Sequence, residues 1–97
     1  MHVVKLKTIE LYYKSNNQSK KHLLAWYEET KAAEWETPQD IKDRYSSASI
    51  LPDNIVVFNI KGNDYRLVTK LSYKNQTVFI KFIGTHPEYD KWIKKNL

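Results

Sequence analysis

Three strand-like runs in the second half of the chain constrain its fold more than any other feature. They are Ile55 to Ile60, Asp64 to Tyr73 and Gln76 to Gly84, and each is rich in β-branched, aromatic or alternating apolar residues. Gly62-Asn63 and Lys74-Asn75 separate them, and each pair suits a two-residue hairpin turn. Because hairpins join antiparallel neighbours, the pattern predicts an antiparallel meander with helices covering one face.

Helical rather than strand periodicity marks roughly the first 45 residues. Val3-Val4 is expected to form a short edge strand, and Leu6 to Tyr13 a first helix. A second helix is predicted from Ser19, as its N-cap, to about Glu34. Thr37-Pro38-Gln39-Asp40 combines a capping box with proline at the first helical position, and predicts a short third helix towards Tyr45. The predicted fold class is α+β, with N-terminal helices packed on one face of a small antiparallel sheet and a short C-terminal helix.

Composition limits the class of protein. At 97 residues the chain is expected to form a single domain over residues 1–97. It has no cysteine, which excludes disulfides and a thiol nucleophile and fits a reducing cytoplasm. No apolar run approaches the roughly 20 residues that span a bilayer, and the N-terminus lacks the apolar stretch of a signal peptide. The net charge of +5 favours an anionic partner, either nucleic acid or an acidic protein surface.

The residue inventory predicts neither a metal site nor a cofactor. His2, His22 and His86 are scattered without the spacing of metal ligands. Two glycines are too few for a glycine-rich phosphate loop, and the serines lack the pattern of a nucleophile elbow. An enzyme with this sequence would therefore work with Arg, Lys, His and Tyr side chains.

The two predicted turns fix a strand register. Phe58 should lie opposite Leu67, Asn59 opposite Arg66, and Leu71 opposite Val78, while Val68 should face Lys81 and Leu67 should face Phe82. This register gathers an apolar core face: Val56, Phe58, Ile60, Tyr65, Leu67, Leu71, Val78, Ile80 and Phe82. The opposite face gathers Asn59, Lys61, Arg66, Val68, Lys70, Phe79, Lys81 and Ile83. A one-residue slip would destroy both groupings, so their coherence supports the register.

The second face has two interpretations. Four cations beside apolar side chains suit a polyanion whose bases need a surface to lie against. The alternative is an ordinary solvated face, with lysines serving solubility and edge protection. Arg66 favours the first interpretation, because its planar guanidinium matches a phosphate.

The segment Gly84 to Asp90 carries the second candidate feature. Thr85 and Glu88 have capping-box spacing, so His86 should lie in the first turn of a terminal helix. A neutral imidazole at the start of this helix suits accepting a proton from a ribose 2′-hydroxyl. A structural role, in which His86 only donates a hydrogen bond to a loop carbonyl, is an equally good interpretation of the spacing. Tyr89 would stack on a base or Asp90 would orient the ring, while Trp92 and Ile93 should pack inwards and anchor the helix.

Two longer stretches resemble the HigB family of bacterial toxins. Val57 to Val68 is similar to the family signature, and so is Phe79 to Lys91. Ala25-Trp26-Tyr27 and Tyr45 to Leu51 are similar as well, so the resemblance covers nearly the whole chain. It implies the RelE-like fold, with helices on an antiparallel sheet, and the role of toxin in a type II toxin–antitoxin pair. Many such toxins cleave messenger RNA, usually on the translating ribosome, and use the ribose 2′-hydroxyl without a metal.

The resemblance also implies partners and roles. A HigA-type antitoxin with a helix-turn-helix domain would neutralise the toxin and repress the shared operon. Arg66 and Lys81 would stabilise charge on the scissile phosphate, while His86 would accept the 2′-hydroxyl proton or protonate the 5′-oxygen. The catalytic residues implied are Arg66, His86, Lys81 and Tyr89, and the RNA-binding residues are Asn59, Lys61, Lys70 and Asp90. The expected product carries a 2′,3′-cyclic phosphate or the 3′-phosphate derived from it.

Two other functions fit the same residues. A non-catalytic module that binds RNA or the ribosome would block translation by occupancy and would not need His86. A protein-interaction domain would use the basic face for an acidic partner, and that binding would not compete with RNA.

Overall fold

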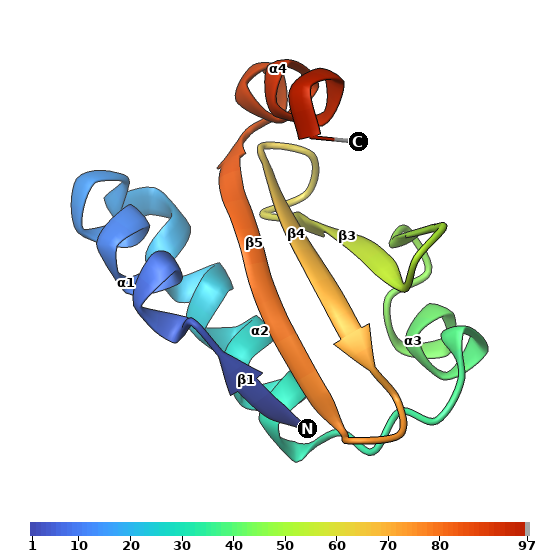
Figure 1. The fold of residues 1–97 in the computed structure, drawn as a ribbon. Helices are drawn as coiled ribbons and strands as arrows, with labels where there is room; N and C mark the ends of the chain where they lie inside the picture. The colour runs from blue at the N-terminus through green and yellow to red at the C-terminus, as the bar shows by residue number, and fades with distance from the viewer. Residues whose placement is uncertain (97) are drawn as a thin grey trace.

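The computed structural model of the protein, which describes residues 1–96, places helices around one mixed sheet (Figure 1). The elements in chain order are β1 (His2–Val4), α1 (Leu6–Ser15), the 3-10 turn η1 (Asn17–Ser19), α2 (Lys20–Ala32), α3 (Pro38–Arg44), β2 (Ser49–Leu51), β3 (Ile55–Ile60), β4 (Tyr65–Ser72), β5 (Thr77–Thr85) and α4 (His86–Asn96). The five strands lie in the order β1-β5-β4-β3-β2. The α+β class predicted from the sequence is confirmed.

The two hairpins form where the turn residues predict them. The Asp64 N–H donates to the Lys61 carbonyl at 3.2 Å around Gly62-Asn63, and the Gln76 N–H donates to the Tyr73 carbonyl at 3.3 Å around Lys74-Asn75. Gly62 has φ +64, a left-handed conformation that glycine adopts without strain. The central strands β3, β4 and β5 are therefore antiparallel neighbours, as expected.

Both edges of the sheet differ from the expected antiparallel meander. The predicted edge strand at Val3-Val4 forms as β1, but it pairs with β5 in parallel, with Val3 beside Val78. The prediction of a wholly antiparallel sheet is thus wrong. The chain leaves β1 through the helices and returns along β5 in the same direction. At the other edge β2 pairs with β3, and the sequence pattern did not predict this three-residue strand.

A β-bulge in β5 changes part of the predicted register. Asn59 lies opposite Arg66 and Phe58 opposite Leu67, as predicted, and Leu71 also pairs with Val78. The pairing shifts by one residue between Thr69 and Val68, so that Val68 faces Phe82 and Leu67 faces Ile83. The predicted pairings of Val68 with Lys81 and of Leu67 with Phe82 are therefore wrong. The reason is that Lys81 is an extra residue on β5.

The bulge exchanges two side chains between the faces of the sheet. Ile83, which the regular alternation placed on the basic face, is buried in the core. Phe82, predicted in the core, lies instead with Val68 on the opposite face. One extra residue reverses the alternation of every position that follows it.

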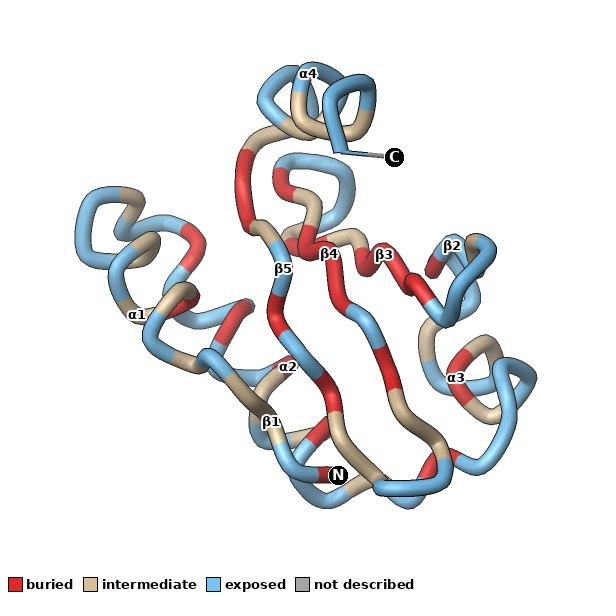
Figure 2. Tube along the Cα trace, viewed as in Figure 1, coloured by how far each residue is buried: buried red, intermediate tan, exposed pale blue. Residues whose placement is uncertain are grey.

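The main core lies between the sheet and the helices α1, α2 and α3. Ile9 of α1 and Leu23 and Trp26 of α2 are buried against strand residues that include Phe58 and Ile80. The ring centroids of Trp26 and Phe58 are 5.4 Å apart in an edge-to-face arrangement. The buried stretches along the central strands appear in Figure 2 as continuous or alternating red segments. Burial of this apolar face is the dominant favourable contribution to folding.

Local signals explain where the helices start. Asp40 and Thr37 exchange side chain to backbone hydrogen bonds at the start of α3, which confirms the predicted capping box. Ser19 precedes α2 as predicted, but its hydroxyl donates to the Asn16 carbonyl at 2.6 Å and does not cap the helix. The helix ends at Ala32, two residues before the predicted Glu34. None of the described helices is long and apolar enough to span a membrane.

Helix α4 packs on the sheet face opposite to α1 and α2. Trp92 stacks on Phe82 with ring centroids 5.1 Å apart, and Tyr89 packs with the same apolar cluster as Val57 and Val68. Trp92 thus anchors the helix as predicted, but against this second face rather than against the main core. Figure 1 shows α4 at one end of the sheet, so that the other end of this face is left open.

Candidate functional site

Strand pairing brings Arg66 beside the start of α4. Arg66 lies opposite Gly84 in the ladder of β4 and β5, and His86 follows Gly84 by two residues. A Cβ atom on Gly84 would lie 2.6 Å from the Phe82 ring and 3.1 Å from the Glu88 Cβ. Glycine is therefore required for the close packing of the strand end, the Phe82 ring and the first turn of α4.

A capping box fixes the first turn of α4. The Thr85 N–H donates to the Glu88 carboxylate at 2.7 Å, and the Glu88 N–H donates to the Thr85 hydroxyl at 3.4 Å. This confirms the predicted box and makes His86 the first residue of the helix. Asp90 lies one turn later, and its Oδ2 is 3.2 Å from His86 Nδ1. The ring is thus oriented by a carboxylate on its own helix, and both side chains are exposed.

Arg66 and Tyr89 complete the group. The Arg66 guanidinium donates to the carbonyls of Asn63 and Tyr65 at 3.3 and 3.5 Å, and its side chain is half-buried. Burial raises the pKa of the Tyr89 hydroxyl, the Arg66 charge opposes that rise, and the Asp90 carboxylate adds to it. Both charges therefore act on the Tyr89 hydroxyl. Arg66, His86, Tyr89 and Asp90 are called the His86 cluster below.

Lys70 and Lys81 lie away from this cluster, beside the other half of α4. They line a hollow of about 230 Å³ together with Asp53, Trp92 and Asn96. The backbone of Lys81 precedes Gly84 by three residues, or ~10 Å of strand. The stacked pair of Trp92 and Phe82 sits within this region of the face. The structure thus divides the predicted basic face into two parts.

Asn59 and Lys61 do not join the His86 cluster. The Asn59 amide donates to the Ser47 carbonyl at 3.3 Å. The Lys61 ammonium lies 3.3 Å from Gln18 Oε1 and 3.5 Å from Asp64 Oδ2. Lys61 has φ +53 in the hairpin turn, so it lies outside the strand alternation that placed it on the basic face. The RNA-binding role of these two residues stays a prediction.

Tyr12 and Glu88 form a contact that sequence reasoning missed. The Tyr12 hydroxyl of α1 lies beside the Glu88 carboxylate, and its ring packs edge-to-face on Tyr65 at 5.9 Å. Burial, the Glu88 carboxylate and Tyr65 together raise the pKa of Tyr12 to about 12. The carboxylate that caps the first turn of α4 thus also acts on the Tyr12 hydroxyl of α1. No spacing in the sequence indicates it, because the partners are 76 positions apart, at 12 and 88.

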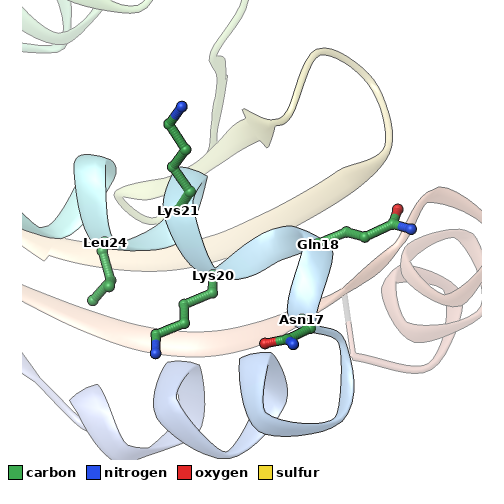
Figure 3. Close-up of a pocket in the computed structure, with 5 residues that line it drawn as sticks. All are labelled: Asn17, Gln18, Lys20, Lys21 and Leu24. Atoms are coloured by element: carbon green, nitrogen blue, oxygen red, sulfur yellow. The ribbon is translucent and has the colours of Figure 1, made fainter.

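A separate hollow at the start of α2 has different chemistry. Asn17, Gln18, Lys20, Lys21 and Leu24 line it, and the two lysine side chains point in different directions (Figure 3). Amides, ammonium groups and one leucine offer no acid–base pair near neutral pH. The His86 cluster is the better candidate site, because it holds an imidazole–carboxylate pair, and the carboxylate and a guanidinium both act on the same phenol.

Comparison with known proteins gives one family and a consistent set of relatives. Residues 19–92 match the family HigB_toxin, described as the RelE-like toxic component of a toxin–antitoxin system. The chain is 27% identical over 92 residues to the mRNA interferase toxin HigB of Escherichia coli K12, covering 93% of this chain and 88% of that protein. The same identity and coverage hold for the mRNA interferase HigB of Escherichia coli O157:H7 and of Shigella flexneri. The matched region includes β2 to β5 and the start of α4, and therefore the whole His86 cluster.

Proposed function

This chain belongs to the HigB family of RelE-like toxins of toxin–antitoxin systems, and from that premise we propose that it is a metal-independent endoribonuclease. The family resemblance found in the sequence is thereby confirmed. The substrate is messenger RNA, cleaved on the translating ribosome, and the result is inhibition of translation. Relatives named mRNA interferase support this activity.

One observation carries the proposal for the site. His86 begins α4 with its Nδ1 3.2 Å from the Asp90 carboxylate, and Arg66 lies across the ladder from Gly84. The tautomer that donates from Nδ1 to Asp90 leaves a lone pair on Nε2. An imidazole held in this way is suited to proton transfer beside a guanidinium that binds phosphate.

The proposed reaction is an internal transesterification. His86 Nε2 takes the proton of the ribose 2′-hydroxyl, and the 2′-oxygen forms a bond to phosphorus. The bond from phosphorus to the 5′-oxygen breaks, and that oxygen takes up a proton from water. The products are a 2′,3′-cyclic phosphate and a 5′-hydroxyl end. If His86 acts as the acid instead, its imidazolium protonates the 5′-oxygen and the proton of the 2′-hydroxyl passes to water.

The other residues act on charge and position. Arg66 stabilises the negative charge that develops on the phosphate oxygens. The charges of Arg66 and Asp90 both act on the Tyr89 hydroxyl. Tyr89 positions the nucleotide at the scissile bond. Lys70 and Lys81 contact the RNA backbone, with Asn59 and Lys61 as outer contacts. Lys81 acts there rather than at the scissile phosphate, because it lines the hollow with Lys70.

The proposal includes partners and place of action. Residues 1–97 act as one toxin domain in the cytoplasm, where messenger RNA and ribosomes are found. A HigA-type antitoxin with a helix-turn-helix domain neutralises it. The family description, which names a toxin–antitoxin system, supports an antitoxin partner.

Mapping the 5′ ends of cellular messages after induction tests this function. Wild type is expected to produce codon-linked cuts and growth arrest, while His86→Ala produces neither. His22→Ala is the matched control, because His22 is an exposed histidine on α2, outside the cluster. Intact messages with stalled growth would favour a module that acts by occupancy. Full cleavage by a well-expressed His86→Ala variant would remove His86 from the mechanism.

A further inference from the structure

Phe79 is an exposed aromatic residue in the middle of a sheet. Its side chain is 40% exposed although it lies within β5 and has strand partners on both sides, Val4 and Lys70. It belongs neither to the main core nor to the cluster under α4. Part of the Phe79 ring is therefore accessible to a ligand on this face.

Two free lysines flank Phe79 on the same face. Lys70 lies directly opposite on β4, a position that brings Cβ atoms to about 4.5–5.5 Å. Lys81 follows two residues later on β5 and lines the same hollow as Lys70. Neither lysine forms an ion pair with a residue in the described part of the chain, although Asp53 also lines that hollow.

This combination suits a single-stranded nucleic acid. A flat aromatic face stacks on an unpaired base without preference for its identity, and ammonium groups neutralise the adjacent phosphates. An acidic peptide would use the lysines but would leave the ring without a flat partner. The patch lies on the sheet face that carries the His86 cluster, next to α4, whose Trp92 and Asn96 line the same hollow as the two lysines.

We propose that Phe79, Lys70 and Lys81 form an RNA subsite in which one unpaired base stacks on the Phe79 ring. The subsite rests on the proposed RNA-cleaving function and extends it. Phe79 precedes Gly84 by five residues, or roughly 17 Å of strand, so the stacked base lies several nucleotides from the scissile phosphate. Phe79 is therefore a positioning residue that binds the substrate strand and takes no part in the reaction.

Binding to an uncleavable RNA tests the subsite separately from cleavage. The probe is a fluorescent 2′-O-methyl oligoribonucleotide, and the readout is fluorescence anisotropy with purified toxin. Phe79→Ala is expected to weaken binding roughly 5- to 150-fold, the range for loss of one stacked base, whereas Phe79→Trp retains it. Leu24→Ala is the matched control, because Leu24 is similarly exposed at 37% but lies on α2.

Salt dependence tests the lysines. Lys70→Gln and Lys81→Gln should each make the slope of log affinity against log salt shallower by about 0.7, as expected for one lost phosphate contact on a single strand. Lys21→Gln, an exposed lysine of α2, should leave the slope unchanged. The subsite is overturned if Phe79→Ala binds like wild type, or if the controls weaken binding as much as the patch variants.

Kinetics separate this proposal from the proposed activity. On translated messages, Phe79→Ala should raise KM and leave kcat unchanged. A toxin that binds the probe through Phe79 but cuts no message would support the subsite and refute the nuclease. Codon-linked cutting with an unchanged KM for Phe79→Ala would refute the subsite alone.

Discussion

The two faces of the sheet are built from the same strands but packed very differently. On the first face Phe58 is fully buried and contacts three aromatic rings, Trp26, Trp35 and Tyr45. On the second face Phe82 is half-exposed and stacks on one ring, that of Trp92. The first face stabilises the fold, and the second leaves polar and charged groups free to meet a ligand.

The difference shows how a 97-residue chain combines stability with a site. Alternation along β3, β4 and β5 sends one set of side chains into the core and the other set outwards. Substitutions on the first face should therefore change stability, and those on the second should change activity. The first three of the four predictions below test this division.

The largest effect is expected on the first face. Phe58→Ala removes a fully buried ring and should lower the free energy of unfolding by about 3–5 kcal/mol. Phe82→Ala removes a half-exposed ring and should cost about 1 kcal/mol of packing. Urea unfolding of both variants measures the difference. Equal costs would mean that α4 stabilises the fold as strongly as α1 and α2 do.

Arg66→Ala should have the largest effect on the second face. Loss of the guanidinium should reduce cleavage about 10²- to 10³-fold, as for other groups that stabilise developing charge, and abolish growth arrest. The melting temperature of the Arg66→Ala variant and its binding to the antitoxin should stay close to those of wild type. Arg44→Ala is a matched control, since Arg44 is an exposed arginine at the end of α3. A large loss of stability in Arg66→Ala would give the residue a structural role.

The two capping boxes offer a smaller and better matched comparison. Thr37→Ala and Thr85→Ala each remove one cap hydrogen bond and should each destabilise the protein by ~1 kcal/mol. Only Thr85→Ala should also lower cleavage, because His86 directly follows the lost cap. Thermal unfolding and message cleavage are measured in parallel. Equal activity in the two variants would show that the cap at α4 does not position His86.

The smallest effect concerns acid stability. Backbone N–H groups of Glu36 and Thr37 donate to Asp40 and hold the pKa of its carboxyl below 3.8. Because the pKa of Asp40 is lower in the folded state, its carboxylate adds stability at pH values above the unfolded-state pKa of 3.8. That stability is lost as the pH falls through the folded-state pKa. The stability advantage of wild type over Asp40→Asn should therefore shrink below pH 3.8. A stability difference between wild type and Asp40→Asn that stays constant below pH 3.8 would contradict this prediction.

Local signals made much of this fold predictable. Gly62-Asn63 and Lys74-Asn75 fixed both hairpins, and the boxes at Thr37 and Thr85 located two helix starts. These features depend on residues within a few positions of one another. The parallel pairing of β1 was not predictable in this way, because Val3 and Val78 meet only through the tertiary fold.

The site was predictable in part for the same reason. His86 and Asp90 are one helical turn apart, and Arg66 reaches Gly84 through a hairpin. The contact of Tyr12 with Glu88 depends on how α1 packs, and the division of the basic face depends on where α4 lies. The bulge escaped prediction because Phe79 to Ile83 fits a regular strand equally well by its apolar pattern.

The bulge at Lys81 makes the length of β5 as important as its composition. Phe79 and Gly84 are an odd number of residues apart, yet both lie on the second face, because Lys81 adds one step to the alternation. If β5 paired regularly, without the bulge, this odd spacing would turn the strand end, with the helix that follows it, towards the other side of the sheet. A single substitution along β5 would disturb one contact, whereas loss of the bulge with Lys81 still present would move Gly84 away from Arg66. The bulge and the spacing of residues along β5 together therefore keep Gly84 opposite Arg66 and keep α4 on the second face.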